Sequence, residues 1–182
     1  MLKIEDHRRP QPLSAPTGFA LWNLGFRPFY LLASGFAALS ILLSLDQYAG
    51  YLPAVHVRDP AWRAADATGV RRRARSHGHE MLFGYTMAVI AGFLLTAVRN
   101  WTGKSTPAGA SLIALAVLWV AGRVLILTPY AVAAAVVNAA FPVAVAIGIG
   151  IPIVASRNRR NYFFIALMLL LGLAVLAFHL AH

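Results

Sequence analysis

The chain has 182 residues, of which 59% are hydrophobic and only 12% are charged. Soluble domains carry roughly 25% charged residues, so this composition excludes an ordinary soluble domain and predicts that the lipid bilayer is the chain's main surroundings. The net charge of +10 comes from Lys and Arg that lie almost entirely in the N-terminal tail and between apolar blocks. That distribution favours membrane insertion, and without a recognised binding motif it excludes nucleic acid as a partner.

Residues 1–28 are predicted to form a polar N-terminal tail and an interfacial segment, because the tail contains three prolines and no apolar periodicity. The aromatic and cationic residues from Trp22 to Tyr30 are typical of the headgroup level of a membrane.

Residues 29–182 predict an all-α fold, a polytopic transmembrane helix bundle of about five helices. The expected helices are residues 29–45, 81–98, 111–128, 132–155 and 162–180. Each is near the ~20 residues that cross the hydrocarbon of a bilayer. Pro129 predicts a tight turn and a helical hairpin, and Pro142 and Pro152 predict kinks in the fourth helix.

The charges of the connections predict a cytoplasmic N-terminus. The connections that would then face the cytoplasm after the second and fourth blocks are basic, and the short one after the third is not. Arg71, Arg72 and Arg73 run against this orientation, since they would lie outside beside the second helix. The cytoplasmic basic residues of those connections are Arg99, Lys104, Arg157, Arg159 and Arg160.

The strongest chemical signal is His77-Gly78-His79-Glu80-Met81, at the start of the second block. Because the chain has no cysteine, a metal would need ligands such as imidazole, thioether or carboxylate. Residues two apart on a regular helix point in nearly opposite directions, so His77 and His79 would bind two different centres or simply face water at the interface. The chain would cross the membrane four times between the start of the second helix and the end of the fifth, so these two points fall on the same side. His179, near the end of the fifth helix, would then lie on the same side of the membrane as these two histidines.

Arg123 lies inside the third apolar block. A charge at that depth costs roughly 3 kcal/mol on insertion scales, so it is expected to face the bundle interior with a partner. The candidate partners are Asp46, Glu80 or an anionic group of a cofactor, and the alternative is that Arg123 extends to the nearby interface. No nucleophile–base pair, phosphate-binding loop or paired-carboxylate pattern defines a catalytic site, which leaves enzymatic activity open.

These residues resemble the NnrS family of bacterial membrane proteins. The resemblance implies a haem- and copper-containing protein of the bacterial inner membrane, linked to the nitric oxide response and to denitrification, with nitric oxide or a related small gas as a partner. It implies that His77 and His79 are metal or haem ligands, that His179 belongs to the cofactor site, and that Arg123 is a buried cation beside it. The matching runs are Gly25 to Tyr30, His77 to Tyr85, Ala88 to Val98, Asn100 to Gly103, Leu118 to Arg123 and Asn158 to Phe164.

Two departures from the family modify this expectation. Arg99 stands where family members tend to have proline, and those members are about twice as long, so the resemblance covers their N-terminal half. A second membrane subunit or a homo-oligomer would then supply the other half. Two further interpretations stay open: a half-module of a transporter or channel, and a truncated, non-catalytic membrane scaffold.

Overall fold

The computed structural model describes residues 20–49 and 84–180. Within these ranges the structure is all-α, as the sequence predicts, with five α-helices and two short 3₁₀ helices. The elements in chain order are η1 (Ala20–Asn23), α1 (Phe26–Tyr48), α3 (Thr86–Thr102), α4 (Ala110–Ile126), α5 (Ala131–Ala155), η4 (Arg159–Asn161) and α6 (Tyr162–Leu180).

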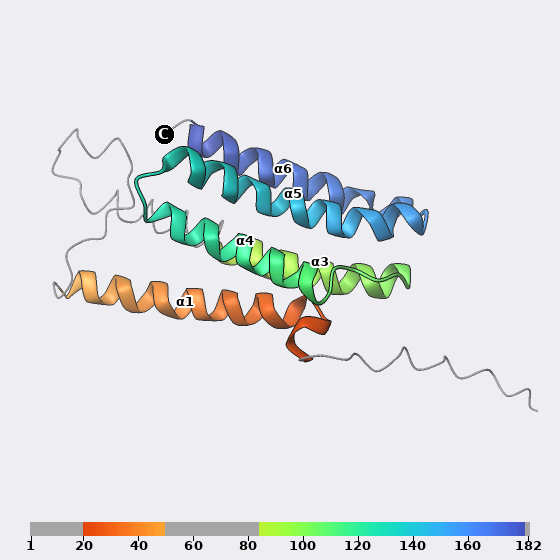
Figure 1. The fold of residues 1–182 in the computed structure, drawn as a ribbon, viewed down its shortest axis with the longest axis horizontal. Helices are drawn as coiled ribbons and strands as arrows, with labels where there is room; N and C mark the ends of the chain where they lie inside the picture. Colours follow the sequence, from red (N-terminus) through yellow and green to blue (C-terminus); the bar gives the residue numbers. More distant parts are fainter. Residues whose placement is uncertain (1–19, 50–83, 181–182) are drawn as a thin grey trace, which may run out of the picture.

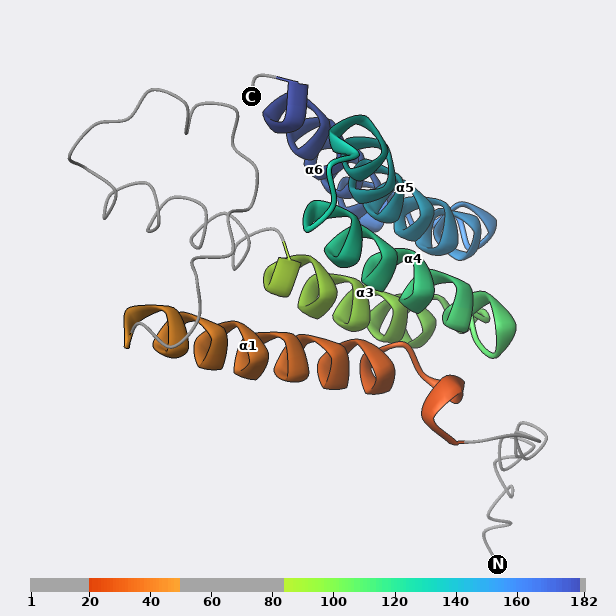
Figure 2. The ribbon, with the colours of Figure 1, turned by 60° about the vertical axis from the view of Figure 1, so that its left-hand side comes forward.

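The helices lie alongside one another in a bundle (Figures 1 and 2). Helix α5 packs against α3, α4 and α6, whereas α1 packs mainly against α3. Helices α3 and α5 begin at the end of the bundle where α1, α4 and α6 finish (Figure 1). We call this end the Arg123 end. The opposite end, which carries Arg27, Arg99, Lys104, Arg157, Arg159 and Arg160, is the basic end.

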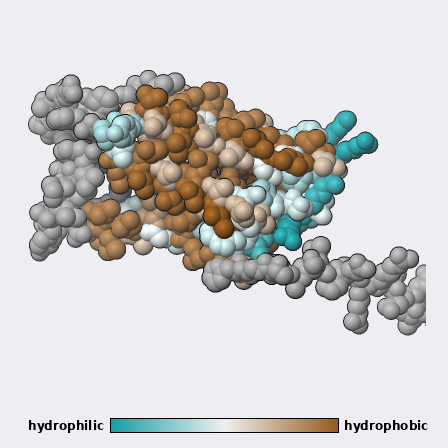
Figure 3. All heavy atoms as spheres, viewed as in Figure 1, coloured by the Kyte–Doolittle hydropathy of each residue, from teal (hydrophilic) through white to brown (hydrophobic). Residues whose placement is uncertain are grey.

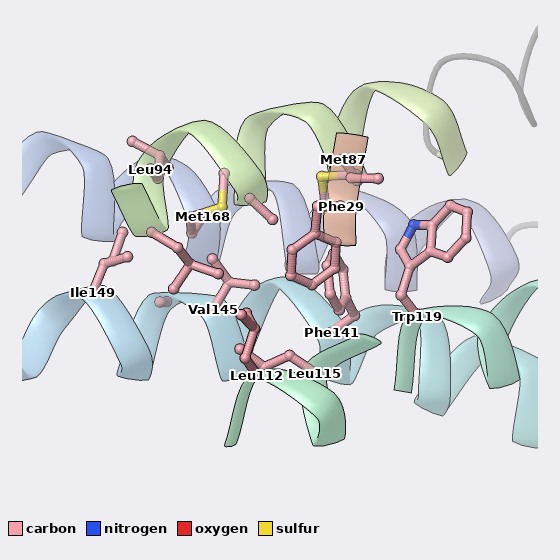
Figure 4. Close-up of a cluster of buried hydrophobic side chains, with 14 of the residues drawn as sticks. Phe29, Met87, Leu94, Leu112, Leu115, Trp119, Phe141, Val145, Ile149 and Met168 are labelled. Atoms are coloured by element: carbon pink, nitrogen blue, oxygen red, sulfur yellow. The ribbon is translucent and has the colours of Figure 1, made fainter. Parts of the chain in front are cut away.

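A continuous apolar core joins the helices (Figure 4). Phe29 of α1 is fully buried, and its ring centroid lies 5.6 Å from that of Phe141 in α5. Leu94, Val145 and Met168 extend the core through α3, α5 and α6. Because these contacts come from helices distant in sequence, the core fixes the relative positions of all the elements that carry the site.

The outer surface is also apolar, as Figure 3 shows for one face. Leu31 is 64% exposed, Val132 78% and Ile151 68%. Segments 26–43, 131–155 and 159–178 are long and apolar enough to cross a membrane, and α4 is a shorter apolar helix. Such a surface suits contact with lipid tails.

Several helix boundaries differ from the predicted ones by a few residues. Helix α1 begins at Phe26, inside the predicted interfacial segment, because Pro28 falls in the first turn, where no N–H is needed for an intrahelical bond. Helix α4 ends at Ile126, since the position before Pro129 disfavours helical geometry. Helix α5 continues through Pro142 and Pro152, both of which are buried. The start of the predicted helix 81–98 lies partly outside the described residues.

Candidate functional site

The predicted ligands sit mostly beyond the part of the chain that the structure describes. His77, His79 and Glu80 lie outside the described residues, and so do the side chains of Asp46 and His179. The backbone of His179 belongs to the last turn of α6, at the Arg123 end. The prediction that the three histidines meet therefore stays a prediction.

Arg123 lies in the last turn of α4, and its side chain contacts neighbouring helices of the bundle. Its Nη2 donates a hydrogen bond to Oδ1 of Asn138 in α5. Its guanidinium carbon also lies 6.0 Å from the centroid of the Trp119 ring, which is within the range of a cation–π contact. These contacts hold the positive charge against α5 and against the indole of Trp119.

Asn138 is the buried polar residue that the sequence analysis missed. It is 6% exposed, and its Nδ2 donates to the carbonyl oxygens of Gly122 at 3.1 Å and Ala134 at 2.8 Å. A Cβ added at Gly122 would lie 2.7 Å from the Asn138 Oδ1, so a glycine is needed where the two helices meet. The available signal was that Asn138 is the one strongly polar side chain between residues 131 and 155. Such residues in membrane helices usually bond to a neighbouring helix.

Gly84 brings the start of α3 into the same cluster. The Trp119 Nε1 donates a hydrogen bond to the Gly84 carbonyl oxygen at 3.2 Å. A Cβ at Gly84 would lie 2.8 Å from Arg123 Nη1 and 2.9 Å from Phe36 Cε1. Phe36 in turn packs edge to face on Trp119, with ring centroids 5.6 Å apart. The first described residue after the histidine run therefore lies close to the guanidinium of Arg123.

A small cavity of about 10 Å³ lies beside this cluster, near the volume that one water needs. It is far below the ~300 Å³ of the smaller ligand pockets, so the described helices do not enclose a haem-sized group next to Arg123. Within residues 20–49 and 84–180, no three His, Cys, Asp or Glu residues gather into a metal site. The interpretation of Arg123 and α5 as a transport pathway stays a prediction. The cavity is lined by Met87, Leu118, Trp119, Arg123, Val137, Asn138, Phe141 and Val175.

What this cluster offers chemically is a positive charge in a largely apolar setting, where charges interact more strongly than in water. Val175, which lines the cavity, precedes His179 by one helical turn of α6. The Arg123 end therefore contains the positive charge of Arg123, the last turn of α6 with His179, and Gly84, which follows the predicted ligands His77 and His79 in the sequence.

Comparison with protein families finds a match over residues 20–182 to the family described as NnrS protein. No curated protein and no solved structure matches the chain. The family match and the long apolar helices together make this chain a membrane protein.

Proposed function

Because the chain belongs to the NnrS family, we propose that it binds haem or copper at the Arg123 end and takes part in the bacterial response to nitric oxide. In this proposal His77 and His79 supply imidazole ligands and His179 completes the site from α6. Imidazole suits both haem iron and copper, so the donor set fits either group. The proposal assigns binding and handling of a small gas, with no defined reaction.

The observation that carries the proposal is the contact between Gly84 and the Trp119–Arg123 pair. Gly84 accepts a 3.2 Å hydrogen bond from Trp119 and leaves no room for a side chain beside the guanidinium. Gly84 follows His79 by five residues. A chain segment of that length spans at most ~18 Å, so the covalent chain keeps His79 near the cluster whatever its conformation.

The position of α6 supports the same site. Val175 lines the cavity beside Arg123, and His179 lies four residues further along the helix. Four helical residues rise by about 6 Å, which brings His179 toward the end of the bundle and toward the segment that precedes Gly84. A ligand set drawn from both segments would lie at the mouth of the bundle, beyond the water-sized cavity.

Arg123 would act on this site as a held positive charge. A haem propionate or another anionic group of the bound cofactor would be favoured near it, because the surroundings screen the charge weakly. Small apolar gases dissolve in lipid, so they need no aqueous channel to reach a site between helices. Histidine orientation and the polarity of the surrounding helices would set the potential of the metal.

The orientation that we propose places the basic end in the cytoplasm of a bacterial inner membrane. Six of the seven described cations lie at that end, and they sit in short connections or close to helix ends, where charge determines topology. The first described helix, which follows the N-terminal tail in the sequence, starts at this end (Figure 1), so the tail would be cytoplasmic too. The remaining described cation is Arg123, within α4.

Cysteine labelling tests this orientation directly, because the chain has no cysteine of its own. Tyr130→Cys changes a 66% exposed residue in the turn between α4 and α5. Lys104→Cys changes an exposed residue in the connection after α3. A membrane-impermeant maleimide applied to intact cells should label the first variant and spare the second. The reverse pattern would refute a cytoplasmic basic end.

A visible absorption spectrum with metal analysis tests the binding proposal. The detergent-purified chain should show a Soret band or bound copper, and the His77→Ala/His79→Ala variant should lose it. His56→Ala is the matched control, a histidine of the same connection outside the motif, and should keep it. A folded wild-type chain without colour or copper would overturn cofactor binding by this chain alone, as would full retention in the double variant.

A further inference from the structure

A groove runs on the surface along the start of α1 and the last turns of α3 at the basic end, where the Phe26 N–H donates to Thr96 Oγ1 at 3.1 Å. Its volume is about 360 Å³, within the size range of ligand pockets. The base includes Ala97, which is 8% exposed, and the half-buried Thr96. The rim is aromatic, since Tyr30, Phe93 and Trp101 line the groove and are 40–49% exposed. The groove thus has a largely apolar lining and an aromatic rim, facing outward from the bundle.

The aromatic rim is itself fixed by packing. Trp101 stacks on Phe164 of α6, with ring centroids 5.3 Å apart, and meets Phe93 edge to face at 6.2 Å. Tyr30 meets Phe26 edge to face at 6.0 Å. Exposed Trp and Tyr at the end of an apolar bundle are typical of the headgroup level of a membrane. The groove therefore begins at the headgroups and extends toward the hydrocarbon.

A cation stands at the mouth of the groove. Phe26 lines it, and the guanidinium carbon of Arg27 lies 5.9 Å from the centroid of the Phe26 ring. Arg27 donates one hydrogen bond, from Nη1 to the Ala20 carbonyl oxygen at 2.7 Å, which anchors it. A guanidinium has five N–H donors, so this bond leaves others for a phosphate.

The charge around the mouth is of one sign. Six cations lie at the basic end, and the sequence contains no Asp or Glu after Glu80. The one acidic residue within the described ranges is Asp46, near the other end of α1. Figure 3 shows the hydrophilic side chains gathered at the basic end beside the apolar surface. This pattern complements a ligand with an acyl chain and a negative headgroup.

The geometry points to a binding site for one anionic phospholipid in this groove. An acyl chain lies along Ala97 between the aromatic side chains, and the phosphate meets Arg27 at the mouth. This inference is independent of haem or copper binding, because it concerns the opposite end of the bundle. A zwitterionic lipid would fill the apolar part equally well but would gain less from the surrounding cations.

Native mass spectrometry of the detergent-purified chain tests this site. Palmitoyl-oleoyl phosphatidylglycerol should bind at least about fivefold more tightly than the phosphatidylcholine of the same chains, since one basic residue near a headgroup contributes about that factor. Arg27→Gln should remove this preference. Arg160→Gln is the matched control, with the same loss of charge at an exposed residue of η4, whereas Arg27 lies over Phe26 of the groove, and it should keep the preference.

A second pair of variants tests the apolar lining of the groove. Unlike Arg27→Gln, these variants leave the hydrogen bond from Arg27 to the Ala20 carbonyl oxygen in place. Ala97→Leu should fill the groove and lower the retention of both lipids several-fold, whereas Ala114→Leu, on an exposed position of α4, should not. Equal binding of the two lipids would overturn the inference, and so would equal losses in Arg27→Gln and Arg160→Gln. A stable dimer blocked by Ala97→Leu would also overturn it, because a second copy of the chain would then occupy the groove.

Discussion

Replacing Asn138 by leucine should destabilise the bundle through the charge of Arg123. The change removes the Oδ1 that accepts from Arg123 Nη2 and the two bonds that Nδ2 donates to Gly122 and Ala134. Asn138 is almost fully buried, so water does not readily take over its role as acceptor. Leucine has the same branching and the same number of side-chain heavy atoms as asparagine but is larger, so the packing cost is removed by comparing the change in two backgrounds.

The magnitude follows from the kinds of bond that are lost. A hydrogen bond to a charged group contributes about 1.5–3 kcal/mol, while polar contacts between membrane helices average nearer 0.6 kcal/mol. We therefore expect Asn138→Leu to lower the free energy of unfolding by about 2 kcal/mol. In an Arg123→Met background the same change should cost less than about 1 kcal/mol, because no partly buried charge then loses an acceptor. The two sites should thus be coupled by at least about 1 kcal/mol.

Equilibrium unfolding in mixed micelles of a mild detergent and sodium dodecyl sulfate, followed by far-ultraviolet circular dichroism, measures these values. Val136→Leu, an apolar change at an exposed position of the same helix, is the control and should stay within about 0.5 kcal/mol of the wild type. Equal costs for Asn138→Leu in the two backgrounds would refute the reasoning. The charge of Arg123 would then not depend on Asn138.

Three further outcomes follow from the same end of the bundle. Gly84→Ala should destabilise by about 1–3 kcal/mol in the same unfolding assay, because its Cβ would lie 2.9 Å from Cε1 of the Phe36 ring, which packs on Trp119, whereas Gly35→Ala, which meets nothing within 4 Å, should be neutral or stabilising. His179→Ala should lower the haem or copper content of the purified chain by tenfold or more, and His182→Ala should leave it unchanged. Dialysis of a copper-loaded chain against a chelator should lower its unfolding temperature, and the temperature should recover when copper returns. An unchanged temperature would indicate that the metal does not bind the folded chain.

The sequence was sufficient for the fold class because apolar blocks of near-membrane length have few other solutions. It was less informative about which helices touch. Helix α6 is apolar on all sides, so no stripe in its sequence marks the face that meets α5. The close contacts appear instead at small residues, as where a Cβ at Gly172 would lie 3.3 Å from Pro142 Cγ. Small residues are too frequent in this chain for their pairing to be deduced from sequence.

The candidate site was predictable in one part and missed in another. Arg123 is conspicuous as a charge within an apolar block, which predicted that it faces the bundle interior with a partner or else extends to the interface. The expected partners were charged groups, whereas the structure supplies the neutral amide of Asn138. The hairpin that Pro129 predicts places both residues in the halves of α4 and α5 nearest the turn. An amide carries no charge, yet it can accept from a guanidinium and donate to two helix carbonyls at once.

The two ends of the bundle use positive charge in different ways, and this difference bears on where a cofactor would bind. At the basic end, Arg27 and Arg99 donate to the carbonyl oxygens of Ala20 and Asn23, and the other four cations are exposed. Charges in such surroundings are screened by water and salt, so each contributes only a modest factor to binding, such as the about fivefold lipid preference proposed for Arg27. Arg123 is held between helices beside an indole, where screening is weak. An anionic cofactor group would gain more free energy from this one cation than from the six at the other end, so we expect variants of Arg123, and not of the basic end, to change cofactor affinity.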